Sequence, residues 1–162
     1  MMPPRKTTLD KLDYQIICEL HADARVAAST IARKTGANER TVRKRIDRLV
    51  SDGVLRLTAI IDPAAFGYLI TTDIFLEADP SQEEAIIKRL QAMNEITYIA
   101  YGLDSQELSI EGRFKDNEEL RNFLLQVLPS IPGVTVTRYA LVPRILRNID
   151  EWMPDEKDFQ NI

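Results

Sequence analysis

Six side chains in the N-terminal part of the chain have the chemistry to bind a polyanion. Five are basic and one carries a hydroxyl: Arg40, Thr41, Arg43, Lys44, Arg48 and Arg56. Arginine and lysine donate hydrogen bonds to guanine O6 and N7 in the major groove of DNA and also neutralise phosphates. The stretch 36–54 holds five Arg/Lys against three Asp/Glu, although the formal net charge of the whole chain is −4. These residues are therefore candidates for contact with double-stranded DNA.

The element that carries most of these residues is predicted to be a helix that begins after Asn38 and ends at Ser51. Asn38 is a favourable N-cap residue. At about 100° per residue, Val42, Ile46 and Leu49 fall within about 60° of one another, as expected of a buried helix face. The positive charge is then directed mostly away from the core.

The basic side chains of this helix divide by position. Arg40 and Lys44 lie opposite the buried face, and with Thr41 they occupy the N-terminal part of the helix, which meets base edges in helix-turn-helix docking. Glu39 is a further candidate there. A solvated charged helix with no partner is the alternative, and the helix alone does not exclude it.

The remaining cations have different predicted roles. Arg43, Arg48 and Arg56 are better placed for phosphates than for bases. Asp47 is spaced for an intrahelical ion pair with Arg43 or with Lys44. Arg45 lies near the edge of the apolar face, and we expect its stem to pack on the domain rather than to touch a base.

Two further helices are predicted before the basic one. An apolar stripe predicts a helix over residues 10–22, and it consists of Leu9, Leu12, Ile16, Ile17 and Leu20. A shorter helix fits residues 28–35, where Gly36 is suited to end it. Three helices with a tight turn between the second and third form a helix-turn-helix. The alternating residues 54–62 predict a strand pair, the wing of a winged variant.

Residues 9–68 resemble the Lrp/AsnC family of transcription regulators. The resemblance lies in "LDKLDYQIICEL", "DAR", "IARKTGANERTVRKRIDRLVSDGVL" and "AIIDPAAFGY", in this order and at this spacing. It implies a winged helix-turn-helix that is joined by a hinge to a ligand-sensing and oligomerising domain.

The charge distribution also indicates two modules. Residues 1–62 hold 12 Lys/Arg and 8 Asp/Glu, net +4, whereas residues 63–162 hold 9 and 17, net −8. We expect a DNA-binding domain over residues 1–62, a hinge over 63–68, a second domain over 69–145 and a C-terminal tail over 146–162. In the tail, Trp152, Met153 and Phe159 are too apolar to stay in water, and we expect at least Trp152 to pack on the fold or on a neighbour.

The second domain is predicted to be a ferredoxin-like sandwich, which makes the fold class α+β. Its strands are expected in "LITTDIFLEA", "ITYIAYGLD", "QELSIEGRF" and "VTVTRYALV", with helices after the first and third strands. This βαββαβ order places both helices on one face of the sheet. Phe75, Tyr98, Tyr139 and Leu141 are candidates for the other face, and an uncovered apolar face predicts self-association.

The family resemblance also implies a ligand and an assembly. In the family a small effector, commonly an amino acid, binds between subunits near the loop that joins the second and third strands, where a Gly precedes an Asp. Gly102 and Asp104 match this pattern, with Leu103 and Ser105 where aromatic residues often stand. From the residues alone, the same Gly and Asp also fit a plain hairpin turn. The resemblance further implies homodimers and often octamers.

Composition excludes several other classes of protein. No apolar run reaches the roughly 18 residues of a membrane span, and Met1–Thr8 lack the apolar core of a signal peptide, so we expect no membrane partner and a cytoplasmic location. The single Cys18 and single His21 argue against a metal site, a cofactor site or a catalytic triad. We therefore expect no enzyme activity.

Two alternatives to a sequence-specific regulator remain from the sequence. One is an architectural protein that compacts DNA with little sequence preference. The other is an enzyme similar to siroheme decarboxylases, which look similar in organisation but would be expected to use more histidine than this chain holds.

Overall fold

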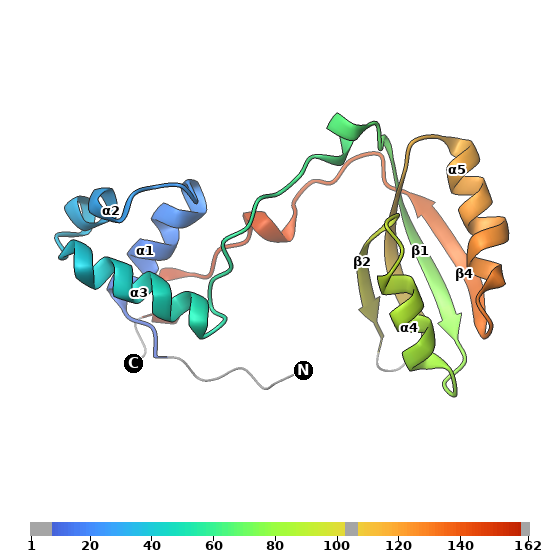
Figure 1. Ribbon diagram of the computed structural model, residues 1–162, viewed down its shortest axis with the longest axis horizontal. Coiled ribbons are helices and arrows are strands. Elements are labelled where there is room, and N and C mark those ends of the chain that lie inside the picture. Colours follow the sequence, from blue (N-terminus) through green and yellow to red (C-terminus); the bar gives the residue numbers. More distant parts are fainter. Residues whose placement is uncertain (1–7, 103–106, 160–162) are drawn as a thin grey trace. The chain divides into compact units, whose positions relative to one another are not determined.

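The computed structural model describes residues 8–102 and 107–159, and it consists of two compact units (Figure 1). The first, called here the helical unit, contains the described residues up to Ile60 together with Arg147–Phe159. The second, the sheet unit, is Ile61–Leu146. The chain therefore leaves the helical unit after Ile60 and returns to it at Arg147, so that the C-terminal segment belongs to the same unit as the predicted DNA-binding helices.

Three helices make up most of the helical unit: α1 (Lys11–Ala22), α2 (Ala28–Thr35) and α3 (Glu39–Ser51). Helix α1 begins with a capping box, because the Asp10 carboxylate accepts from the backbone N–H of Asp13 and the Asp13 carboxylate accepts from that of Asp10, both at 3.0 Å. Between α2 and α3 the chain turns at Gly36, whose φ of 72° favours glycine. The Asn38 side chain then caps α3 by accepting from the backbone N–H of Arg40 at 2.8 Å. The predicted helix-turn-helix is confirmed.

Among the described residues, the predicted wing is not formed. Residues 54–62 are extended, but no β-pairing of this segment is found among the described residues. A strand needs a partner for its backbone groups, and the spacing of apolar residues that predicted the wing does not supply one. After this segment, a short 3-10 turn spans Pro63–Phe66 and ends at Gly67.

The sheet unit has the predicted βαββαβ order. Its main elements are β1 (Ile70–Ala78), α4 (Glu83–Gln91), β2 (Ile96–Tyr101), β3 (Glu107–Phe114), α5 (Asn117–Asn122) and β4 (Val134–Leu141). All strand pairs are antiparallel, in the order β2-β3-β1-β4. Helix α5 continues through a π-helical turn, Phe123–Val127, and a 3-10 turn, Leu128–Ser130, so this helical stretch is longer than α5 alone.

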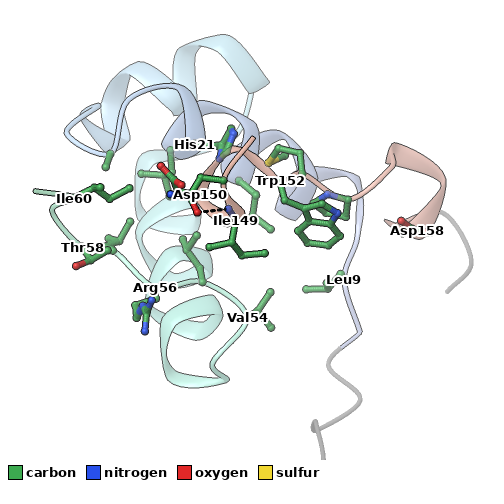
Figure 2. A pocket seen from close by; sticks show the side chains of 18 of the residues that line it. Leu9, His21, Val54, Arg56, Thr58, Ile60, Ile149, Asp150, Trp152 and Asp158 are labelled. Carbon is green, nitrogen blue, oxygen red and sulfur yellow. Dashed lines mark hydrogen bonds between the residues drawn. The ribbon is translucent and has the colours of Figure 1, made fainter. Parts of the chain in front are cut away.

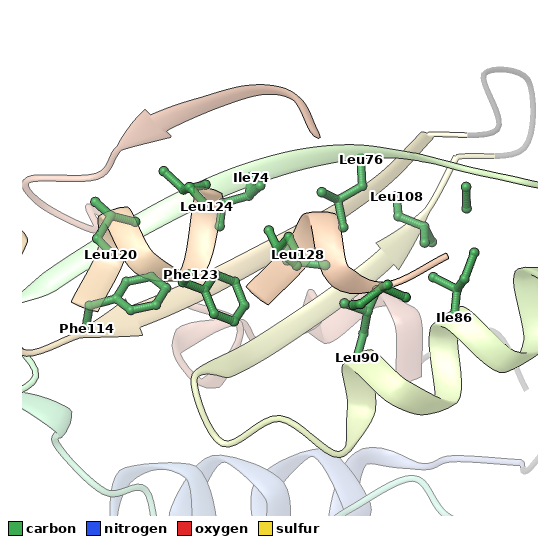
Figure 3. Close-up of a cluster of buried hydrophobic side chains, with 13 residues drawn as sticks. Ile74, Leu76, Ile86, Leu90, Leu108, Phe114, Leu120, Phe123, Leu124 and Leu128 are labelled. Carbon is green, nitrogen blue, oxygen red and sulfur yellow. The ribbon is translucent and has the colours of Figure 1, made fainter. Parts of the chain in front are cut away.

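Both helices cover the same face of the sheet (Figure 3). The core consists of alternate strand residues and of the apolar stripes of the helices, and the side chains drawn include Ile74, Leu76, Leu108, Phe114, Ile86, Leu90, Leu120, Phe123, Leu124 and Leu128. In β3 the burial alternates strictly, with Leu108 and Ile110 inside and Ser109 and Glu111 partly exposed. Ser109 and Glu111 therefore lie on the face of the sheet that neither helix covers.

The prediction for this open face was partly wrong. Tyr98 and Phe75 belong to it, because Tyr98 pairs with Glu111 and Phe75 pairs with Ser109. The Arg138 guanidinium lies 3.5 Å from the centre of the Phe75 ring. Tyr139 and Leu141, however, pair with the buried Ile74 and Thr72 and so lie on the same side of the sheet as these residues, although on this edge strand they are 57% and 58% exposed. A bulge between Phe75 and Leu76 shifts the register of β4 by one residue, and such a shift moves the following side chains to the opposite face.

Of the three apolar residues of the C-terminal segment, Phe159 is buried in the helical unit and Met153 packs partly buried against the same core. Phe159 is 5% exposed and its ring lies 5.1 Å from that of Tyr14 on α1, whereas Trp152 is 58% exposed. Phe159 ends a short 3-10 turn, Glu156–Phe159, and an earlier turn spans Ile149–Glu151. The core of the helical unit thus includes a residue that lies more than a hundred positions beyond the helices in the sequence.

Replacing Phe159 tests this packing. Phe159→Ala should lower the free energy of unfolding of the helical unit by about 3 kcal/mol, because it removes a buried aromatic side chain from the core. Trp152→Ala is the matched control and should cost less than about 1 kcal/mol, as expected of a largely exposed residue. Urea denaturation followed by circular dichroism measures both, and a larger loss from Trp152→Ala would contradict the packing described.

A buried hydroxyl in β1 allows a second test. The Thr72 side chain is fully buried and its Oγ1 has no hydrogen-bond partner among the described residues, whereas the neighbouring Thr71 accepts a hydrogen bond from Arg113 at 3.2 Å. Thr72→Val should therefore raise the free energy of unfolding of the sheet unit by about 1 kcal/mol, because an unsatisfied buried polar group is removed. Thr71→Val should lower it. Urea denaturation of both variants measures this, and a loss of stability in Thr72→Val would contradict the assignment.

Candidate nucleic-acid interface

The buried face of α3 is the one expected from its sequence. Val42 and Leu49 have no exposed surface, and Ile46 packs partly buried against the same core. On the remaining surface of the helix, the side chains of Arg40, Thr41, Arg43 and Lys44 are exposed. The helix therefore presents a basic surface that is fixed from behind by apolar packing.

Arg45 is held inside the unit by two carboxylates of the α1 N-terminus. Its Nη1 donates to Asp10 at 2.7 Å and to both oxygens of Asp13 at 3.0 Å, and its side chain is 28% exposed. The hydrogen bond to Asp10 is the main reason that the pKa of Arg45 is raised. Burial acts to raise the pKa of the Asp10 carboxyl, but the Asp13 backbone N–H and the Arg45 guanidinium outweigh it and hold that pKa below its ordinary value. The structural role predicted for Arg45 agrees with these contacts.

Arg48 makes a contact that the sequence reading missed. Its Nη2 donates to the Asp13 carboxylate at 2.5 Å, and its side chain is 36% exposed. The residue thus has a structural partner and a partly exposed side chain at the same time. The only signal in the sequence is Asp13 itself, an acidic residue in the first turn of α1 beside the apolar stripe.

Arg43 and Arg56 are the other two residues predicted to contact phosphates. Arg43 pairs with Glu39, from Nη2 at 2.6 Å and from Nε at 3.0 Å, rather than with Asp47. Arg56 is exposed on the extended segment after α3 and lines a cavity of about 770 Å³ that belongs to the helical unit. It lies on a different element from the other basic residues.

That cavity is mainly apolar (Figure 2). It is bounded by α1, by residues 54–60 and by the C-terminal segment, from which Ile149 and Trp152 line it. His21, the single histidine, is exposed near the end of α1 and lies at its edge. Within the described ranges, no cluster of three or more His, Cys, Asp or Glu is arranged to hold a metal ion.

The predicted effector residues are only partly visible. Leu103, Asp104 and Ser105 lie outside the described residues. Gly102 ends the pairing of β2 with β3, and its backbone N–H donates to the carbonyl of Glu107 at 2.9 Å. The loop that should carry the effector site is therefore closed at its base by a backbone hydrogen bond.

Among the described residues, no helix is both long and apolar enough to cross a membrane.

Comparison with known proteins decides the family. The model of the AsnC-type helix-turn-helix domain matches residues 9–50. An uncharacterised HTH-type transcriptional regulator of Pyrococcus horikoshii is 31% identical over 149 residues, which are 91% of this chain and 92% of that protein. The chain belongs to the Lrp/AsnC family. As a member of this family, it is a DNA-binding transcription regulator.

Solved structures of Lrp/AsnC proteins share the fold of this chain. E. coli AsnC superposes with a TM-score of 0.80 at 21% identity, over 89% of this chain and 99% of that one. A feast or famine regulatory protein of M. tuberculosis, solved in complex with L-methionine, gives a TM-score of 0.79 at 25% identity over 90% and 99% of the two chains. The arrangement of the elements within each unit is thus that of an established regulator.

The exposed basic residues of α3 lead to a prediction on sequence discrimination. Arg40→Ala and Lys44→Ala should each reduce the ratio of the affinity for the recognised DNA site to the affinity for a mismatched site. The expected reduction is about tenfold per lost base contact, without a loss of thermal stability. Arg121→Ala on α5 is the control and should leave the ratio unchanged. Competition binding measures the ratio, and unchanged discrimination in both α3 variants would remove them as base readers.

Proposed function

We propose that this protein binds specific DNA sequences as a homodimer and that a small amino acid modulates this binding. The observation that carries the DNA part is the division of charge on α3. Arg45 is held by Asp10 and Asp13, whereas Arg40 and Lys44 are exposed and make no ion pair among the described residues. A helix that is fixed by its core side and basic on its outer side fits the major groove.

The proposed contacts follow from these positions. Arg40, Thr41 and Lys44 read base edges, and Arg43, Arg48 and Arg56 contact phosphates. The Glu39 carboxylate keeps Arg43 extended along the helix, since the two side chains pair one turn apart. The protein needs no cofactor or metal for this activity.

Dimerisation supports the DNA contact by symmetry. The open face of the sheet carries Phe75 and the 59% exposed Tyr98 among charged residues, and a second copy on this face would cover the two rings. A two-fold dimer can place two copies of α3 about 34 Å apart, on successive major grooves. We propose that such dimers assemble further, for example into an octamer. We also propose that the protein is cytoplasmic.

The effector part rests on the relatives and on the loop sequence. The M. tuberculosis protein with 25% identity was solved with L-methionine. In this chain, Gly102, Leu103, Asp104 and Ser105 occupy the loop between β2 and β3, where Asp104 is the acceptor that we propose for the α-amino group of the ligand.

Selection of bound genomic fragments, with and without a panel of free amino acids, tests the proposal. We expect recovered fragments to share a sequence and to bind at least about 10³-fold more tightly than random DNA at physiological salt. We also expect one or more amino acids, with L-methionine as the first probe, to change the affinity, and Asp104→Ala to remove that change. Glu84→Ala, an exposed residue of α4, is the control.

The same measurements discriminate the alternative. A DNA-compacting protein would bind selected and random fragments with a ratio near one at every salt concentration. That result would contradict sequence-specific regulation, and the absence of any response to amino acids would contradict the effector.

A further inference from the structure

Among the described residues, Asp13 is the only charged side chain that is buried from solvent. Its carboxylate accepts from the backbone N–H of Asp10 at 3.0 Å, from Nη1 of Arg45 at 3.0 Å and from Nη2 of Arg48 at 2.5 Å. A carboxylate in this position is stable only if donors satisfy it on all sides. One buried group of α1 therefore determines where two arginines of α3 lie.

The two arginines differ in what else holds them. Arg45 also pairs with Asp10 and is 28% exposed, so two carboxylates fix it. Arg48 has Asp13 as its carboxylate partner, and its Nε is buried without a hydrogen-bond partner among the described residues. With 36% of its side chain exposed, against 28% for Arg45, Arg48 is the more exposed member of the pair.

The guanidinium group has a geometry suited to two acidic partners at once. It is planar and carries five N–H donors, so that one terminal nitrogen can donate to a carboxylate while the other donates to a phosphate. A lysine ammonium has a single nitrogen and no such fork. A phosphate on the exposed side of Arg48 would therefore complete the hydrogen bonding of a side chain that Asp13 already orients.

We propose that Asp13 is a positioning residue for DNA binding, which holds Arg48 so that its guanidinium bridges the buried carboxylate and one phosphate of the DNA backbone. The proposal rests on the proposed placement of Arg48 at the backbone and adds the buried group that acts through it.

A double-mutant cycle on the full chain tests this role. The variants are Asp13→Asn, Arg48→Ala and the double variant, each compared at a temperature where circular dichroism shows it folded. Affinity for a random-sequence DNA duplex is measured across potassium chloride concentrations. Arg48→Ala should weaken binding about tenfold and reduce the salt slope by about 0.9, the value for one phosphate contact. Asp13→Asn should do the same.

The decisive result is the effect of Asp13→Asn in the Arg48→Ala background. If Asp13 acts through Arg48, no further loss of affinity or slope occurs there. A full additional loss in the double variant would show that Asp13 affects DNA binding independently of Arg48 and would overturn the proposal. An unchanged slope in Arg48→Ala alone would instead overturn the placement of Arg48 at the DNA, and the bridge with it.

Two further variants keep the test independent of the folding of Asp13→Asn. Arg48→Lys retains the charge, but its donors lie on one nitrogen and lack the planar fork, so it should bind DNA less tightly than the wild type, and wild-type binding by Arg48→Lys would overturn the bridge. Asp10→Asn removes a carboxylate that contacts Arg45 and not Arg48, and it should leave the salt slope unchanged. A slope reduced by about 0.9 in Asp10→Asn would assign the effect to Arg45 and contradict the role of Asp13.

Discussion

A carboxylate with no exposed surface has to be neutralised by its neighbours, and Asp13 imposes this constraint on the helical unit. Leaving such a group buried and unpaired costs about 3–5 kcal/mol, a large part of the total stability of a typical domain, about 5–15 kcal/mol. Arg45 and Arg48 supply the positive charge, and both come from α3. The position of α3 on α1 is therefore specified by an ion cluster as well as by the apolar contacts of Val42 and Leu49.

This constraint explains how an acidic protein can carry a DNA-binding helix. Arg45, which faces α1, is neutralised by Asp10 and Asp13 and adds little to the external field, whereas Arg48 pairs with Asp13 but keeps a partly exposed side chain. The cations on the opposite side, Arg40 and Lys44, remain exposed and define the basic surface. The excess of acidic residues beyond residue 62 belongs largely to the sheet unit, which has a separate core and an open face for association.

The sequence predicted what local signals determine and missed what depends on distant contacts. The three helices and the βαββαβ order follow from apolar periodicity, from caps such as Asn38 and from breakers such as Gly36.

The ion pairs of Asp13 join residues 32 and 35 positions apart, and no periodicity reports them. Likewise, a one-residue bulge in β4 reversed the face of Tyr139, and its cause is the pairing with β1 rather than any residue pattern in β4 itself. In the C-terminal segment, apolar character marked Trp152, Met153 and Phe159 alike, and it is the contact with Tyr14 on α1 that identifies Phe159 as the buried aromatic residue. The roles of Arg40, Thr41, Arg43, Lys44 and Arg56 at DNA remain predictions, as does the effector loop.

The division of the arginines of α3 into an internal and an external set is the central claim, and arginine modification by phenylglyoxal, mapped by mass spectrometry with and without bound DNA, tests it most directly. The claim predicts that Arg40 is modified in the free protein and protected when DNA binds, while Arg45 resists modification in both states. Ready modification of Arg45 in the free protein, with protection by DNA at Arg45 and none at Arg40, would contradict it.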